Sequence, residues 1–255
     1  MKIELVQGFQ ILFEKAKNIE FLMERMEKSN ADLLIFGELF LTGYSAMNNM
    51  HELAERRDSV AIREIGEKAR ETRKNVIFGM IEEDELVKGV YYNSAFFIDK
   101  EGAVDSYRKI SLPNFGPFNE KRCFKEGKEV KIFNVDDSRV GVLICYDLFF
   151  PELSGALLGC DILIYLSASP YTSKPQFEKM LYARAIETSS YVLYVNLAGR
   201  EEDMLFWGGS RAIDPFGRDV VKAKYFENEI IDFEIETESL RWMRLHRPVI
   251  RDGKD

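Results

Sequence analysis

Cys145 combines a reactive side chain with a position suited to nucleophilic chemistry. It follows the apolar run Val-Gly-Val-Leu-Ile and precedes Tyr146-Asp-Leu-Phe-Phe-Pro151, so a predicted strand turns there into a predicted helix. Backbone N–H groups and the positive end of a helix dipole at such a turn favour the thiolate, the nucleophilic form of cysteine. Cys145 is therefore a candidate nucleophile, although a cysteine that closes an apolar strand is more often an inert buried side chain.

Two ionisable side chains follow other predicted strands in the same way. Glu38 ends the apolar run Leu-Leu-Ile-Phe-Gly, where a carboxylate can act as a general base and a nearby cation would keep it ionised. A loop carboxylate that accepts backbone hydrogen bonds fits the local sequence about equally well. Lys109 follows the predicted strand 103–107, and on its own it has the simpler interpretation of a solvated surface charge.

The three positions together are more informative than any one of them. Sheets of α/β proteins gather their sites at the carboxyl ends of strands, so we expect Glu38, Lys109 and Cys145 to converge. They would supply proton transfer, oxyanion stabilisation and the nucleophile, respectively. The two histidines, His51 and His246, lie far along the sequence from any candidate nucleophile, which disfavours a papain-like Cys–His pair.

The elements that must position these side chains alternate along the chain. Apolar periodicity predicts helices over 13–29, 52–74, 150–159 and 174–190. It predicts strands over 2–10, 31–36, 76–81, 90–98, 103–107, 130–135, 139–145, 161–166, 191–197, 209–214, 219–224 and 229–235. Several strands are apolar on both alternate sets, so both of their faces should be covered, as in layered α/β folds. Residues 111–127 lack periodicity but carry two prolines and three phenylalanines, which indicates an ordered, functional loop.

Composition limits the classes of partner. The 255 residues suffice for one large domain, which we expect to span 1–255, with 236–255 as a basic C-terminal tail. A net charge of −8 and a pI near 5.1 argue against nucleic acid and anionic membranes as partners. No apolar run reaches membrane-spanning length and the first residues do not read as a signal peptide, so we expect a cytoplasmic protein. Three cysteines without CxxC spacing predict neither a disulfide framework nor a zinc site.

Several motifs resemble, in order and spacing, the nitrilase superfamily of carbon–nitrogen hydrolases. Its Glu-Lys-Cys signature is matched around Glu38, Lys109 and Cys145, and the loop 112–124 is most similar to glutaminase domains of glutamine-dependent NAD synthetases. Gly37 stands where the family often has proline, and Ser111 where histidine is common. The matching segments are Gly37-Glu-Leu-Phe-Leu-Thr-Gly-Tyr44, Tyr92-Asn-Ser-Ala95, Tyr107-Arg-Lys-Ile-Ser-Leu-Pro113, Ile144-Cys-Tyr-Asp-Leu-Phe-Phe-Pro-Glu152, Leu166-Ser-Ala-Ser-Pro-Tyr171, Arg184-Ala-Ile-Glu187 and Gly208-Gly-Ser-Arg-Ala-Ile-Asp-Pro-Phe-Gly217.

The resemblance implies an α/β fold arranged as a four-layer α-β-β-α sandwich. It also implies a homodimer or higher homo-oligomer in which sheets continue across subunits. A tail that leaves the last strand often docks at a subunit interface, and a frayed terminus is the competing interpretation. Glu120 would be a second carboxylate that orients the substrate, although a solvated loop charge is the competing interpretation. Tyr146, Phe115 and Ser169 would line the substrate pocket, and no metal or organic cofactor is implied.

The implied activity is hydrolysis of a small carboxamide through a thioester on Cys145, with release of ammonia. No synthetase half follows residue 255 in this sequence, so we expect a stand-alone amidase or a glutaminase subunit that supplies ammonia to a separate synthetase. A non-catalytic relative that only binds amides is the third alternative, because a fold and its motifs can outlast turnover. The pattern does not identify the substrate among linear amides, ω-amides and N-carbamoyl compounds.

Overall fold

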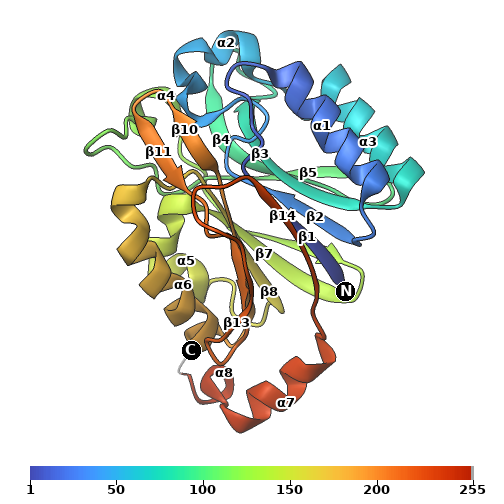
Figure 1. The fold of residues 1–255 in the computed structure, drawn as a ribbon, viewed down its shortest axis with the longest axis vertical. Helices are drawn as coiled ribbons and strands as arrows, with labels where there is room; N and C mark the ends of the chain where they lie inside the picture. Colours follow the sequence, from blue (N-terminus) through green and yellow to red (C-terminus); the bar gives the residue numbers. More distant parts are fainter. Residues whose placement is uncertain (254–255) are drawn as a thin grey trace.

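Two six-stranded sheets face each other at the centre of the molecule (Figure 1). The computed structural model describes residues 1–253, apart from the side chain of Asn48. The first sheet consists, in spatial order, of β14 (Glu229–Glu234), β1 (Lys2–Gln7), β2 (Leu33–Phe36), β3 (Asn75–Glu83), β4 (Tyr91–Ile98) and β5 (Val104–Arg108). The second consists of β13 (Asp219–Lys222), β12 (Arg211–Ile213), β9 (Tyr191–Asn196), β8 (Ile162–Ser167), β7 (Ser138–Ile144) and β6 (Lys131–Val135).

The centre of each sheet is parallel and its edges are antiparallel. Strands β1, β2 and β3 run parallel in the first sheet, and β7, β8 and β9 run parallel in the second. Parallel neighbours need crossover connections, and helices provide them here. The carboxyl ends of β2 and β7, after which Glu38 and Cys145 follow, are therefore fixed by buried strands.

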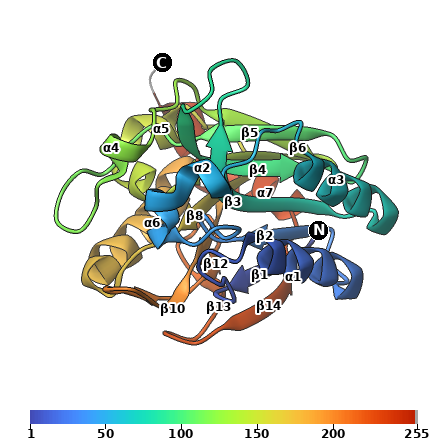
Figure 2. The same ribbon diagram turned by 90° about the horizontal axis from the view of Figure 1, so that it is seen from above.

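Helices cover the outer face of each sheet, which gives four layers (Figures 1 and 2). Helices α1 (Lys15–Lys28) and α3 (Val60–Thr72) lie on the first sheet, and α5 (Pro151–Gly155) and α6 (Lys174–Thr188) lie on the second. Apolar residues such as Leu22, Ile62 and Phe78 fill the space between α1, α3 and the first sheet. Another apolar cluster, which includes Ile35 and Val142, lies between the sheets. The predicted α-β-β-α sandwich is confirmed.

The predicted helix over 52–74 is wrong as a single element. The structure has α2 (Met50–Leu53), an irregular segment, and then α3. Glu55 pairs there with β3, because its N–H donates to Ile81 O over 3.0 Å and its carbonyl accepts from the N–H of Glu83 over 2.9 Å. Ser59 then caps α3 by accepting a hydrogen bond from Ile62 N.

Other boundaries differ because turns end the elements early. The predicted helix 150–159 is only the short α5, preceded by the 3₁₀ turn Cys145–Phe149. A hairpin of β10 (Ala198–Glu201) and β11 (Met204–Trp207) has no counterpart among the predicted strands. The predicted tail contains α7 (Glu238–His246) and α8 (Val249–Asp252), and its place at a subunit interface stays a prediction. Among residues 1–253, no helix has the length and apolar character needed to cross a membrane.

Candidate active site

Two glycines let the segments that carry Glu38 and Lys109 lie close to their neighbours. A Cβ atom on Gly79 of β3 would lie 2.2 Å from the backbone nitrogen of Leu39, so the turn that carries Glu38 can rest on β3 only over a glycine. A Cβ atom on Gly127 would lie 2.0 Å from the backbone oxygen of Arg108. The N–H of Gly127 instead donates to Lys109 O over 2.8 Å, which ties the end of the 111–127 loop to β5.

A fully buried cluster joins two carboxylates to one ammonium group. Lys109 Nζ lies 2.7 Å from Glu38 Oε1 and 2.8 Å from Glu120 Oε1, and all three side chains have no exposed surface. Asn93 Nδ2 donates to Glu38 Oε1 over 2.7 Å, and the Tyr44 hydroxyl donates to Glu120 Oε1 over 2.7 Å. The interpretation of Glu120 as a solvated loop charge is therefore wrong.

The charges of this cluster determine the protonation of Lys109 and Glu120. Burial alone would lower the pKa of Lys109, but the carboxylates of Glu120 and Glu38 outweigh it and raise that pKa. Lys109 therefore stays an ammonium group at neutral pH. Burial, with the nearby charge of Glu38, raises the pKa of Glu120 to about 7 although Lys109 acts against the shift.

Cys145 lies on a sharp turn that a buried carboxylate holds in place. Its φ of 47° is in the left-handed region, which is strained for a residue other than glycine. Asp147 accepts hydrogen bonds from the N–H of Ile144 over 3.0 Å and from the Tyr107 hydroxyl over 2.7 Å. It also accepts from the N–H of Ser111 over 2.8 Å, so Asp147 joins the turn at Cys145 to the segment that carries Lys109.

The pKa of the Cys145 thiol differs from the expectation. The turn was expected to favour the thiolate, which would require a lowered pKa. Burial, followed by the nearby charge of Glu38, raises the pKa of Cys145 well above its ordinary value. Lys109 and the Ala168 N–H act in the opposite direction with smaller effect. The same N–H donates to Glu38 Oε2 over 2.7 Å, which fixes that carboxylate beside Cys145. The raised pKa favours the protonated thiol over the thiolate.

Cys145 opens onto a cavity of about 220 Å³, and half of the residues that line it are aromatic. Phe115 and Tyr146 line it, in agreement with their expected positions. Ser169 does not, because it is buried, its N–H donates to Asn196 Oδ1 and its hydroxyl accepts from Trp207 Nε1 over 3.1 Å. The lining residues are Pro113, Phe115, Phe118, Cys145, Tyr146, Phe149, Pro170, Ser173, Gln176 and Phe177.

The site therefore holds polar residues to which sequence reasoning gave no role. Asn93 stands in the motif Tyr-Asn-Ser-Ala, and Asp147 stands two residues after Cys145, so both belong to motifs that the sequence analysis singled out. Tyr44 ends the motif around Glu38. The part of the chain that the structure describes has no group of three His, Cys, Asp or Glu side chains placed to hold a metal ion.

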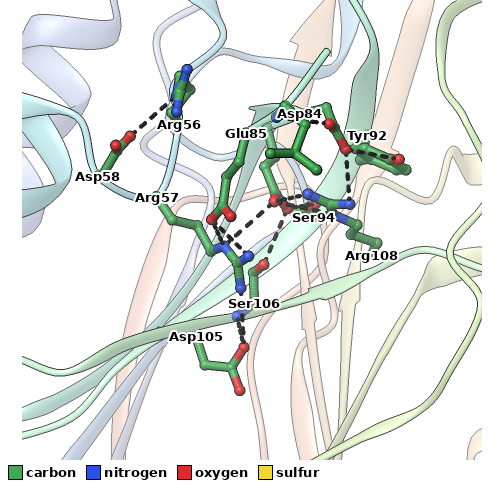
Figure 3. Close-up of polar contacts among 12 residues, drawn as sticks. Arg56, Arg57, Asp58, Asp84, Glu85, Tyr92, Ser94, Asp105, Ser106 and Arg108 are labelled. Carbon is green, nitrogen blue, oxygen red and sulfur yellow. Dashed lines mark hydrogen bonds and ion pairs between the residues drawn. The ribbon is translucent and has the colours of Figure 1, made fainter.

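A second buried carboxylate lies on the opposite face of the same strands. Glu82 of β3 accepts hydrogen bonds from Arg108 Nη2 over 2.6 Å, from Ser94 Oγ over 2.6 Å and from Ser106 Oγ over 3.1 Å. Arg57 approaches it to 3.9 Å from the segment before α3. Figure 3 shows Arg108, Ser94 and Ser106 gathered around one point, whereas the guanidinium group of Arg57 lies between Glu85 and Asp105. We call Glu82, Arg108, Ser94, Ser106 and Arg57 the Glu82 cluster.

Known proteins match the chain over nearly its whole length. A family model described as carbon-nitrogen hydrolase matches residues 5–244. The glutamine-dependent NAD(+) synthetase of Thermotoga maritima is 33% identical over 252 residues, covering 94% of this chain, which spans only 43% of that relative. The 2-oxoglutaramate amidase of Bacillus subtilis is 31% identical over 242 residues, covering 94% of this chain and 91% of the relative.

The fold matches as well. The structure of Saccharomyces cerevisiae Nit3, a member of branch 10 of the nitrilase superfamily, superposes with a TM-score of 0.87 at 23% identity. That match covers 99% of this chain and 96% of the other, and at this identity it concerns the fold alone. The match to the family model over residues 5–244 shows the family as well as the fold. The chain belongs to the carbon–nitrogen hydrolase family of enzymes.

Proposed function

We propose that this enzyme hydrolyses the C–N bond of a small carboxamide through a thioester on Cys145. The observation that carries the proposal is the buried cluster of Glu38, Lys109 and Glu120 next to Cys145 and its cavity. The amidase relative supports the same class of reaction. Cys145 is the nucleophile, Glu38 the general base and Lys109 the oxyanion cation.

The raised pKa of Cys145 determines how the first step proceeds. Glu38 takes the thiol proton as sulfur attacks the amide carbon, so no free thiolate needs to accumulate in the buried site. The electron pair of the carbonyl moves to oxygen, where the Lys109 ammonium and the backbone N–H of Tyr146 stabilise the negative charge. Because the pKa of Lys109 is raised, this residue supplies charge rather than accepting a proton.

The tetrahedral intermediate then collapses with cleavage of the C–N bond. The proton held by Glu38 passes to the leaving nitrogen, and ammonia departs from a thioester on Cys145. Glu38 next takes a proton from water, whose oxygen attacks the thioester carbon. The C–S bond breaks, sulfur regains its proton and the carboxylic acid is released. Glu120 has one of two positioning roles: it orients the amide nitrogen of the substrate, or it orients the Lys109 ammonium group. Lys109 Nζ lies 2.8 Å from Glu120 Oε1.

A panel of primary amides, read out by ammonia release, tests this proposal. Wild type should release ammonia from at least one member, and Cys145→Ala should release none above the blank while unfolding as cooperatively as wild type. Near-normal turnover by Cys145→Ala would refute the assignment of the nucleophile. Inactivity of wild type on the whole panel, with no acylation of Cys145, would favour the non-catalytic amide-binding alternative.

The synthetase relative favours a second candidate function. That relative is a glutamine-dependent enzyme, and this chain matches 43% of its length, so supply of ammonia from glutamine to a separate synthetase is the alternative proposal. Co-purification with an ATP-using ligase, together with glutamine hydrolysis that the ligase stimulates, would support it. Efficient amide hydrolysis by the isolated chain supports the stand-alone enzyme instead.

A further inference from the structure

The cavity beside Cys145 is unusual for its lack of charge. Among the residues that the structure describes, its lining includes no Asp, Glu, Lys or Arg. Building on the proposed amide hydrolysis, we infer that the acyl part of the substrate is an uncharged aromatic or branched alkyl group. The enzyme would then select amides of apolar carboxylic acids over ω-amides that carry a second carboxylate.

Aromatic rings form a continuous wall along this cavity. Tyr146 lies 5.3 Å from Phe115 and 5.8 Å from Phe149 between ring centroids, and Phe149 lies 5.1 Å from Phe177 at nearly a right angle. Phe118 extends the wall beyond Phe115, at 5.4 Å. Tilted and edge-on rings present an apolar surface that binds arenes and branched alkyl groups well.

Neighbouring cations are bound elsewhere and do not turn into the cavity. Lys174 Nζ lies 3.7 Å from the ring centroid of Tyr225. Lys121 lines an adjoining cavity on the other side of Phe115 and Tyr146, whose side chains line both spaces. Its Nζ lies 3.6 Å from a carboxylate oxygen of Glu126.

The polar groups that remain in the lining are neutral. Besides Cys145, only Tyr146, Ser173 and Gln176 contribute polar groups to the described lining. These can accept or donate a hydrogen bond but cannot neutralise a carboxylate. A second carboxylate on the acyl chain would therefore lose its hydration without gaining a cation, and such burial is costly.

The size of the cavity agrees with a compact acyl group. An apolar cavity of about 150 Å³ is large enough to hold benzene. The cavity here measures about 220 Å³, which leaves room for one ring or a branched chain with its carboxamide at Cys145. A larger acyl group would have to displace Phe115, which is 51% exposed at the rim.

Two amides of nearly the same shape test the inference. In 5-methylhexanamide an isopropyl group stands where glutaramate has its carboxylate, so the pair differs in charge and little in size. We expect kcat/KM for 5-methylhexanamide to exceed that for glutaramate by about 100-fold or more. Ammonia release would be measured for both amides with wild type, and with Cys145→Ala as the blank.

A charge placed in the lining sharpens the test. Gln176 is exposed on α6, so Gln176→Arg should fold and should raise kcat/KM for glutaramate about tenfold while lowering that for 5-methylhexanamide. Gln176→Met, of similar length and uncharged, should give no gain on glutaramate.

The outcomes separate the inference from the function on which it rests. Cys145-dependent hydrolysis in which wild type handles glutaramate as well as 5-methylhexanamide would overturn the inference and leave amide hydrolysis standing. Ammonia release that is equal in wild type and Cys145→Ala for both amides would overturn the proposed function, and the inference with it.

Discussion

Two buried carboxylate clusters lie back to back across the edge formed by β3, β4 and β5. Adjacent residues supply both, because successive side chains of a strand point to opposite faces. Asn93 contacts Glu38 on the inner face, whereas Ser94 contacts Glu82 on the outer face. Likewise Arg108 pairs with Glu82, and the next residue, Lys109, pairs with the inner cluster.

The two clusters differ in their balance of charge. In the Glu82 cluster the single fully buried carboxylate is bound by Arg108 and two hydroxyls, and Arg57 lies 3.9 Å away. Both guanidinium groups also pair with more exposed carboxylates, namely Asp84, Glu85 and Asp105. In the inner cluster two carboxylates share the single ammonium of Lys109, and the pKa of Glu120 rises to about 7 as a result of burial and of this excess negative charge. Burial of an ion pair alone thus does not mark a site. Two buried carboxylates that share one ammonium group, beside a thiol and a cavity, do mark a candidate site.

The largest effect should come from removing the proposed base in the inner cluster. Glu38→Gln keeps the size of the side chain but cannot take the thiol proton, so kcat/KM should fall by about 10³-fold or more. Steady-state ammonia release by the purified variant measures this, with circular dichroism as the check of folding. A loss of less than tenfold would remove Glu38 from the role of base.

Removing the shared cation should damage both activity and stability. Lys109→Met leaves Glu38 and Glu120 buried without a counter-charge, and we expect a loss of about 3–5 kcal/mol in the free energy of unfolding. Urea denaturation measures the loss. The double variant Lys109→Met, Glu120→Gln relieves the repulsion and should regain part of this stability without regaining turnover. Full turnover by either variant would contradict the role of Lys109 in stabilising the oxyanion.

The Glu82 cluster should respond in the opposite way. Glu82→Gln removes the carboxylate that Arg108 binds most closely and leaves it only the longer pair with Asp84, so stability should fall by about 1–3 kcal/mol. The kcat/KM of the folded variant should change little, because the substituted side chain points away from Cys145. If Glu82→Gln lost activity as severely as Glu38→Gln at full folding, the distinction between the two clusters would fail.

The smallest predicted effect is a pH dependence that comes from Glu120. Its folded pKa, about 7, lies above its usual value of 4.5, so the native state holds the proton more tightly than the unfolded chain does. This contribution to stability is present at low pH and is lost as the pH rises from about 4.5 to about 7. The Glu120→Gln variant has no ionisable group at position 120, so it serves as the reference. The free energy of unfolding of wild type minus that of Glu120→Gln should therefore decrease between pH 5 and pH 8, and a constant difference would contradict the shift.

The sequence predicted the layers, and which side chains lie near one another, better than the electrostatics. Apolar runs such as 139–145 showed strands covered on both faces, and the motifs around Glu38, Lys109 and Cys145 showed which side chains meet. The state of the Cys145 thiol was missed, because its pKa depends on burial and on a carboxylate that is distant along the chain. The residues around the turn favoured the thiolate, and they carry no information about the burial of the thiol or about the position of that carboxylate.

Contacts across the fold were likewise invisible in the sequence. The break between α2 and α3 arises because Glu55 pairs with β3, a pairing that helical periodicity cannot show. Ser169 was expected in the pocket by motif position, but its hydroxyl binds Trp207, which lies 38 residues further along the chain. The lining of the cavity was foreseen only at Phe115 and Tyr146, since its remaining members come from separate loops and from α6.

The central claim is that Cys145 carries a thioester formed with the help of Glu38. Mass spectrometry of the enzyme quenched during turnover of a slowly hydrolysed amide tests it most directly, with peptide mapping of Cys123, Cys145 and Cys160. The account predicts an acyl adduct on Cys145 alone in wild type, and a strongly reduced rate of its formation in Glu38→Gln. An adduct on another residue, or turnover with no adduct in a Cys145→Ala enzyme, would contradict it.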